Sequence, residues 1–132
     1  MTDTSPAAVL RAAADHLRAL AAAASTDGHG SPTACWDFEE YCFHSGEGRG
    51  AGMLYATDDG PYQTRLLHGA AGRGGGPRVH RQHGEYIAAV NPAVGLALAD
   101  LLADLAHGDA FGEINPWALA LAQRLLGEDT SR

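Results

Sequence analysis

Apolar residues in the first part of the chain recur at steps of three and four, which is the pattern of an amphipathic helix. These positions are Leu10, Ala13, Leu17, Leu20 and Ala24. Ser5 can cap such a helix, and Pro6 suits its first turn because the first backbone N–H groups have no partner within the helix. The sequence therefore predicts a long first helix that ends before Asp27-Gly28-His29-Gly30.

The polar face of this helix carries Arg11, Asp15 and Arg18. Opposite charges three or four residues apart on a helix surface stabilise it by only a few tenths of a kcal/mol per pair. We interpret these three residues as a row of solvent-exposed ion pairs.

From Thr33 onward the pattern changes to the alternation of a strand. Trp36 and Phe38 share one side of this alternation, and Tyr41 and Phe43 share the other. The change of side near Glu39 and Glu40 predicts a bulge or a break.

Two further β-prone runs follow, at residues 52–57 and 62–68. Between them lies Asp58-Asp59-Gly60-Pro61, which is typical of a hairpin turn. The three runs together predict a three-stranded antiparallel meander. Residues 69–84 are rich in glycine and arginine and contain no acidic residue, so we expect a long loop there.

A helix is predicted to begin near Glu85. It places one apolar stripe on a single face: Ile87, Val90, Val94, Leu98, Leu101 and Leu105. Pro92 keeps Asn91 out of the helical region, so the helix either kinks there or restarts with Asn91 as its cap. A last helix opens with Asn115 and Pro116, is apolar on most sides and stops at Gly127.

These elements predict one α+β domain over residues 1–132. It has an N-terminal helix, a small three-stranded antiparallel meander and two C-terminal helices around one core. A chain of this length fits a single domain, and its apolar fraction of 45% is that of a globular protein. We expect residues 1–4 and 129–132 to be disordered.

Composition excludes several classes of function. The chain has no lysine, which a phosphate-binding P-loop and a Schiff-base enzyme both need. A net charge of -7 argues against general DNA binding and against anionic membranes. The most apolar run, residues 94–106, carries Asp100 and Asp104 and is shorter than the about 18 residues of a membrane span.

Without a basic leader, the protein is expected in the cytoplasm, with Cys35 and Cys42 as free thiols.

His80, His83 and Glu85 form the most specific metal-like pattern. Two imidazoles and a carboxylate are suitable zinc ligands, and they would serve a small metal-dependent hydrolase in which Glu85 is a ligand or the base. The histidines are three residues apart, whereas a metalloprotease H-E-x-x-H helix places them four apart. The alternative to a zinc site is that both histidines lie in a loop and bind no metal. In that case the protein is expected to have no cofactor.

Arg73, Arg78 and Arg81 make one locally basic segment in an acidic chain. They are the candidate ligand-binding residues, for a small anion or a local macromolecular contact; the alternative is a solvated loop. Cys42 and His44 would project from the same side of a strand, as a nucleophile and its base must. No recognisable oxyanion hole accompanies them, and no G-x-S-x-G motif is present, so no catalytic residue is assigned.

Three stretches carry a resemblance to a known group of proteins. They are Leu10-Arg11-Ala12-Ala13-Ala14-Asp15 with its continuation to Ala24, residues 85–94 with the Leu-Ala-Leu-Ala-Asp helix after them, and Ala118-Leu119-Ala120-Leu121-Ala122. Together they resemble small proteins of actinobacterial phages and prophages, the Ead-like accessory proteins of temperate phages. Thr-Pro-Gly-Pro-Trp usually follows the first helix in that family, whereas here the first tryptophan is Trp36, so the likeness covers only the outer helical segments.

The resemblance implies an accessory role in a phage or prophage and supplies no catalytic residues. We therefore expect a noncatalytic protein that binds a host or phage macromolecule or a small anionic ligand. The apolar last helix predicts a homodimer, because a helix with so much apolar surface must be covered by the core or by another subunit.

Overall fold

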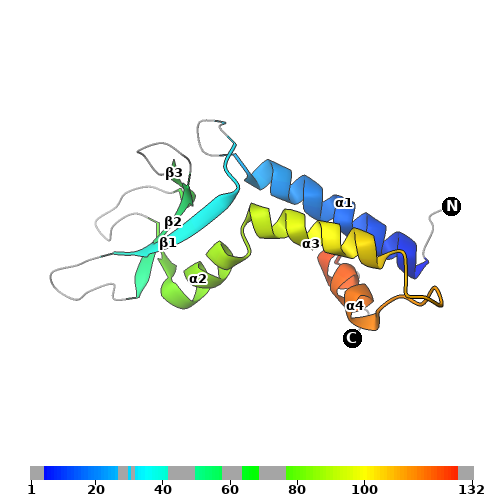
Figure 1. The fold of residues 1–132 in the computed structure, drawn as a ribbon. Coiled ribbons are helices and arrows are strands. Elements are labelled where there is room, and N and C mark those ends of the chain that lie inside the picture. Colours follow the sequence, from blue (N-terminus) through cyan, green and yellow to red (C-terminus); the bar gives the residue numbers. More distant parts are fainter. Residues whose placement is uncertain are drawn as a thin grey trace. The chain divides into compact units, whose positions relative to one another are not determined.

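The computed structural model describes residues 5–26, 30, 32–41, 50–57, 64–68 and 77–127 (Figure 1). The elements in these parts are α1 (Pro6–Ala24), β1 (Cys35–Glu40), β2 (Ala51–Thr57), β3 (Thr64–Arg65), β4 (Val79–His80), α2 (Arg81–Ala89), α3 (Pro92–Leu105) and α4 (Pro116–Leu125). The predicted α+β class is confirmed. Residues 1–4 and 129–132, expected to be disordered, lie outside the described residues.

The chain gathers into two compact units. We call Met1–Ala21 with Val94–Arg132 the helical unit, and Ala22–Ala93 the sheet unit. Each is described by itself. The expectation of a single domain over residues 1–132 stays a prediction.

In the helical unit, α1 begins as the sequence predicts. The Oγ atom of Ser5 accepts a hydrogen bond from the backbone N–H of Ala8 at 3.3 Å. The buried side chains of α1 are Leu10, Ala13, Ala14 and Ala21. Leu20 was expected on the same face but is 52% exposed, because it lies about 80° around the helix from Leu10.

The face that α3 buries differs from the predicted one. Its buried residues are Pro92, Ala99 and Leu102, followed by Ala106 just beyond the helix, whereas Leu101 of the predicted stripe is 53% exposed. Small residues explain the difference, because a Cβ atom added to Gly95 would lie 3.4 Å from the Cβ of Ala21 in α1. The helices approach closely along glycine and alanine, and the larger side chains lie beside this seam.

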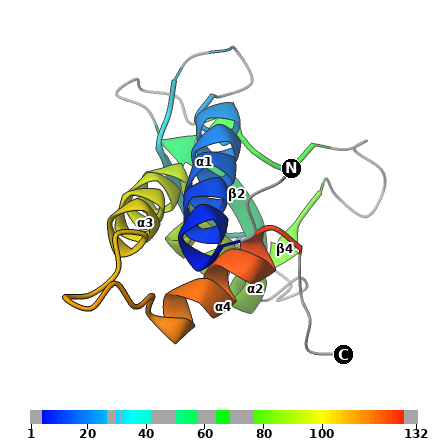
Figure 2. The same ribbon diagram turned by 90° about the vertical axis from the view of Figure 1, so that its right-hand side faces the viewer.

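Alanine dominates the core of the helical unit. Its buried cluster consists of Leu10, Ala13, Ala14, Ala99, Leu102, Ala106, Ala118 and Ala122, contributed by α1, α3 with the residue just after it, and α4. The N-terminus of α4 is capped as predicted: Oδ1 of Asn115 accepts from the N–H groups of Trp117 at 2.8 Å and Ala118 at 3.3 Å. α1 and α3 lie side by side in both views (Figure 1, Figure 2).

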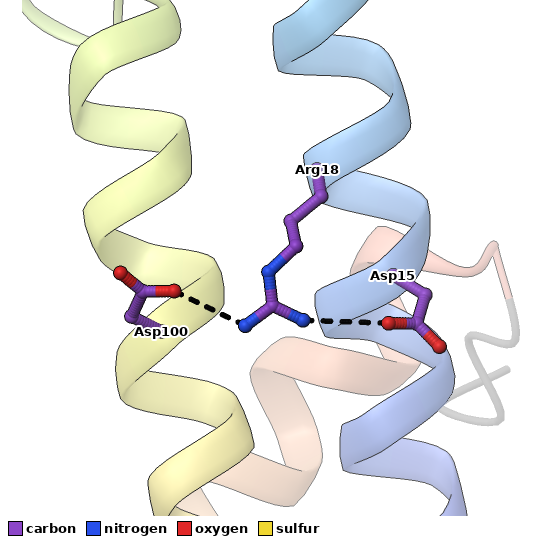
Figure 3. A network of polar contacts seen from close by, with 3 residues as sticks. All are labelled: Asp15, Arg18 and Asp100. Atoms are coloured by element: carbon purple, nitrogen blue, oxygen red, sulfur yellow. Dashed lines mark hydrogen bonds and ion pairs between the residues drawn. The ribbon is translucent and has the colours of Figure 1, made fainter.

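One polar contact joins α1 to α3 at the edge of this core (Figure 3). Arg18 binds Asp15 in its own helix at 3.3 Å and Asp100 in α3 at 3.1 Å. Both carboxylates are largely exposed, so each pair stabilises the unit by about 1 kcal/mol or less. The predicted exposed ion-pair row on α1 therefore also reaches a second helix.

In the sheet unit, β2 is the central strand. β1 pairs antiparallel with β2, from Cys35 opposite Thr57 to Glu40 opposite Gly52. β3 pairs antiparallel with β2 at Tyr55 and Ala56, which completes the predicted meander. β1 remains regular through Glu40, where the sequence predicted a bulge or a break.

β4 was not predicted. It pairs antiparallel with β2 at Ala51 and Gly52, within the segment 69–84 that was expected to be a loop. Backbone groups along this edge of β2 need partners, and Val79 and His80 supply them at the end that β3 leaves free.

The helix that follows starts at Arg81, four residues before the predicted start at Glu85. Residues 69–76 of the expected loop lie outside the described residues.

The predicted helix is broken before Pro92, where the chain restarts as α3, and the role of Asn91 as the cap of α3 stays a prediction. α2 ends at Ala89, and the side-chain amide of Asn91 donates to the carbonyl of Ala88 at 3.1 Å before α3 begins. No single helix in the described parts of the chain has the length and apolar composition to cross a membrane. α2 and α3 meet that requirement only as a pair, taken together across this break.

Phe38 of β1 holds the layers of the sheet unit together. Its ring lies against Gly84 in α2 and near Gly52 in β2, where the carbonyl of Glu39 is closer still to the place of a side chain. A Cβ atom on Gly84 would lie 2.7 Å from Cε2 of Phe38 and closer still to Cδ2. Only glycine at this position lets α2 pack on the sheet at the observed separation.

Gly84 and Gly95 both lie within helices, but we expect substitution by alanine to change the free energy of unfolding in opposite directions. We expect Gly84→Ala to lower the free energy of unfolding by about 1–3 kcal/mol, because its methyl group displaces Phe38. Gly95→Ala meets only ordinary van der Waals contacts and should raise it by up to about 1 kcal/mol through helix propensity. Urea unfolding followed by circular dichroism measures both, and equal effects of the two substitutions would contradict this packing.

Candidate functional site

The predicted ligand-binding arginines are spread over a segment of which only the end is described. Arg73 lies outside the described residues, and Arg78 is an exposed residue just before β4. Arg81, the first residue of α2, forms an ion pair with Glu40 of β1, and its Nε lies 4.0 Å from Oε1 of Glu85. Arg81 thus has acidic partners within the fold, which offset the charge that it would offer to an anion.

Glu40 is the centre of this contact. Its Oε2 pairs with Arg81, and its Oε1 accepts from the backbone N–H of Gly50 at 2.6 Å. The backbone N–H of Arg81 donates to the carbonyl of Gly50. The start of α2, the start of β2 and the end of β1 are therefore tied at one point.

The predicted metal ligands lie on β4 and the first turns of α2. The rings of His80 and His83 meet edge to face, with centroids 6.4 Å apart. Oε1 of Glu85 lies 4.0 Å from Nε of Arg81 rather than beside the two rings. Across the described ranges, no group of three or more His, Cys, Asp or Glu side chains is placed to hold a metal ion. The zinc site and the hydrolase alternative stay predictions.

A pocket that the sequence did not indicate lies in the sheet unit. Its volume is about 430 Å³, within the usual range for small-molecule sites. Its lining consists of Ala24, Thr26, Trp36, Leu54, Arg65, Leu66, Leu67, His68 and Ile87. We call this the sheet pocket.

Three elements position the apolar wall of the sheet pocket. Trp36 and Leu54 come from β1 and β2, and their places in the register put both on the face of the sheet that carries Phe38. Ile87 comes from α2, which packs against Phe38. The backbone N–H of Leu66 donates to the carbonyl of Leu54 at 2.8 Å, which fixes the segment after β3 at the edge of the pocket.

Two residues of the lining, Arg65 and His68, are basic. None of its described residues is acidic. The protein as a whole has a net charge of -7, so the pocket differs in charge from most of the chain. An anion is favoured in such a site over a cation or a neutral molecule.

Trp36 is an unusual wall residue. Its indole Nε1 is buried and has no hydrogen-bond partner among the described residues. A buried unsatisfied donor costs about 1–3 kcal/mol, and tryptophan normally places its N–H against an acceptor. Phenylalanine would supply an apolar wall without that cost, so stability alone does not account for a tryptophan here.

Among its described residues, the lining of the sheet pocket contains no thiol and no carboxylate. The hydroxyl of Thr26 donates to the carbonyl of Ala23 at 3.3 Å. Cys35 is a free thiol, as expected, and is exposed on β1.

The contact between Glu40 and Arg81 gives a direct test of how Arg81 is used. We expect Glu40→Gln to lower the free energy of unfolding by about 1 kcal/mol, because it weakens the ion pair and the bond to Gly50. Glu39→Gln, an exposed neighbour on the same strand, is the control and should change it by less than about 0.5 kcal/mol. Chemical unfolding of both variants checks this, and equal values would mean that Arg81 is not held by Glu40.

Comparison of the chain with protein-family models, with curated proteins and with solved structures gives no match.

Proposed function

We propose that this protein is a noncatalytic accessory protein of the phage or prophage type that binds a small anionic ligand with an apolar body. The accessory role comes from the likeness of the outer helical segments to Ead-like proteins. The binding role comes from the sheet pocket. The observation that carries it is a largely apolar lining that contains the basic residues Arg65 and His68 and, among its described residues, no acidic one.

The apolar wall would supply most of the affinity. Covering apolar surface releases about 25 cal/mol per Å², and Trp36, Leu54, Leu66, Leu67 and Ile87 offer such surface to a ligand. The basic residues would supply orientation and selectivity for an anion, as the few polar groups of a small-molecule site commonly do. A carboxylate on an apolar chain or ring combines both requirements.

The unpartnered indole of Trp36 supports a functional use of the pocket. Residues that break a local rule of stability tend to gather at functional sites, where another requirement outweighs the cost. A wall built for packing alone would not retain a buried donor without an acceptor.

Binding is favoured over catalysis because the lining offers no pair of groups that could act as nucleophile and base. A macromolecular partner is the other class of ligand that the sequence suggests, with the basic segment around Arg78 as its contact. Failure of small anions to bind the sheet pocket would direct the search to that segment.

Fluorescence of Trp36 tests this proposal. Trp36 and Trp117 are the two tryptophans, so Trp117→Phe leaves Trp36 as the sole reporter. In that background we expect decanoate to change the Trp36 emission saturably and decanol to bind more weakly, because only decanoate carries a charge. Replacing both Arg65 and His68 with glutamine should weaken decanoate binding by about tenfold, the loss of one charge-assisted hydrogen bond.

Arg78→Gln is the matched control, because it removes a positive charge from the same sheet unit at a residue that does not line the pocket. It should leave the decanoate affinity within about twofold. Equal affinity for decanoate and decanol would contradict selectivity for anions, and no saturable change with either would contradict the sheet pocket as the binding site.

A further inference from the structure

β1 is an edge strand, and its outer side is unpaired over most of its length. The strand order is β1-β2-β3, with β4 also paired to β2, so β1 has a neighbouring strand on one side only in the described parts of the chain. It is regular and contains no proline. An edge of this kind presents backbone donors and acceptors that a further strand can use.

The ladder between β1 and β2 shows which backbone groups point outward. The N–H of Tyr41 donates to the carbonyl of Ala51 at 2.9 Å, which continues the register of the two strands by one pair. Hydrogen-bonded and non-hydrogen-bonded pairs alternate along an antiparallel ladder. The odd-numbered residues of β1 therefore bond to β2, and the backbone groups of Trp36, Phe38 and Glu40 point away from it.

The outer edge of β1 is occupied at one end and free beyond it. The carbonyl of Ala34, just before β1, points to the same side and accepts from the N–H of Ala93 at 2.9 Å. From Trp36 to Glu40, no outward backbone group is bonded to another described residue. Outward residues of a strand recur about every 7 Å. The partner that matches such a row of donors and acceptors is an extended backbone.

The side chains along the edge indicate which extended segment fits. On one face of β1, Asp37 and Glu39 are exposed, and neither forms an ion pair with a described residue. On the other face, Trp36 and Phe38 are half-buried. Opposite charges directly across a strand pair are stabilising, and so is an apolar side chain beside an aromatic one. A strand next to β1 therefore fits best with basic side chains on the first face and apolar ones on the second.

We propose that the outer edge of β1 binds an extended segment of another protein in which basic and apolar residues alternate. The segment adds to the sheet antiparallel to β1, the orientation of every described strand pair in this sheet. An apolar residue opposite Phe38 exchanges both backbone hydrogen bonds with it, and the basic residues on either side lie opposite Asp37 and Glu39. Main-chain bonds supply the affinity, and the charge pairs supply selectivity.

The same charges disfavour a second copy of this chain at the edge. If two β1 strands paired about a two-fold axis at Phe38, Asp37 of each copy would lie opposite Glu39 of the other. Like charges directly opposite each other destabilise a strand pair, and edge strands use charged residues to avoid pairing with themselves. The homodimer predicted from the apolar last helix stays a prediction about another surface. The proposal for β1 requires neither that dimer nor the sheet pocket.

A short peptide tests the main-chain contacts. The probe is a fluorescein-labelled, blocked peptide, Thr-Lys-Val-Lys-Val-Lys-Thr, and its binding to the full chain at low ionic strength is measured by fluorescence anisotropy. We expect saturable binding. N-methylation of both valine amides removes the donors that face β1 and should weaken binding by at least about tenfold. N-methylation of two lysine amides, which point away from β1, should change the dissociation constant by less than about twofold.

Charge variants test the side-chain contacts. The double variant Asp37→Asn with Glu39→Gln should weaken binding of the unmodified peptide by about fivefold, since each cross-strand charge pair contributes a fraction of a kcal/mol. Asp104→Asn with Glu113→Gln is the matched control, because it removes two exposed carboxylates from the helical unit. It should change the dissociation constant by less than about twofold. Circular dichroism checks that both double variants are folded.

The outcomes separate edge binding from general attraction to an acidic chain. The two methylated peptides have the same composition and charge, so a large difference in their affinities, with weakening by the β1 variant alone, would establish the edge as the docking site. Equal affinities of the methylated peptides would overturn the proposal. So would equal weakening by the two double variants, or no saturable binding of the unmodified peptide up to about 1 mM.

Discussion

The packing of the sheet unit depends on one ring that lies against a glycine. Phe38 fills the space that a side chain at Gly84 would otherwise occupy, and so sets the distance between α2 and the sheet. That distance places Ile87 opposite Trp36 and Leu54 and thereby creates the sheet pocket. The ion pair of Glu40 with Arg81 then secures the same helix at its first residue. The pocket is a consequence of how the layers are spaced rather than of any local motif.

Local patterns predicted much of this fold. The cap at Ser5, the cap at Asn115 and the pairing of the first three strands all follow from signals within a few residues. β4 could not be predicted in this way, because a two-residue strand is defined by the unpaired edge of β2 and not by its own side chains. The sheet pocket was missed for a similar reason: Leu66 and Leu67 fit a continued strand in the sequence, and only the turn after β3 brings them to Trp36 and Ile87.

In the helical unit, the hydrophobic pattern of the sequence predicted the wrong buried face for α3. Hydrophobicity alone places leucine inside, and by that rule Leu101 belongs to the core. The actual seam between α1 and α3 uses Gly95, Ala21 and Ala99, because small residues permit a close approach of the two backbones. In the helical unit, small residues therefore line the seam between α1 and α3, while Leu10 and Leu102 are its large buried side chains and Leu101 lies exposed. The metal ligands and the basic segment remain predictions of the sequence, with Arg81 already paired to Glu40.

The shortness of β3 affects how the sheet pocket can be entered. β3 contacts β2 at only two residues, Tyr55 and Ala56, whereas β1 pairs with β2 along six. Segments held by few backbone hydrogen bonds open locally at much lower free energy than the fold as a whole. With the bond from Leu66 to Leu54, β3 is still attached to β2 by fewer backbone contacts than β1 is, so we expect the segment with Arg65 and His68 to open before β1 and β2 separate. Local opening of this segment would let a ligand enter the pocket on its basic side. Amide hydrogen exchange in residues 64–68 would then be faster than in the centre of β2.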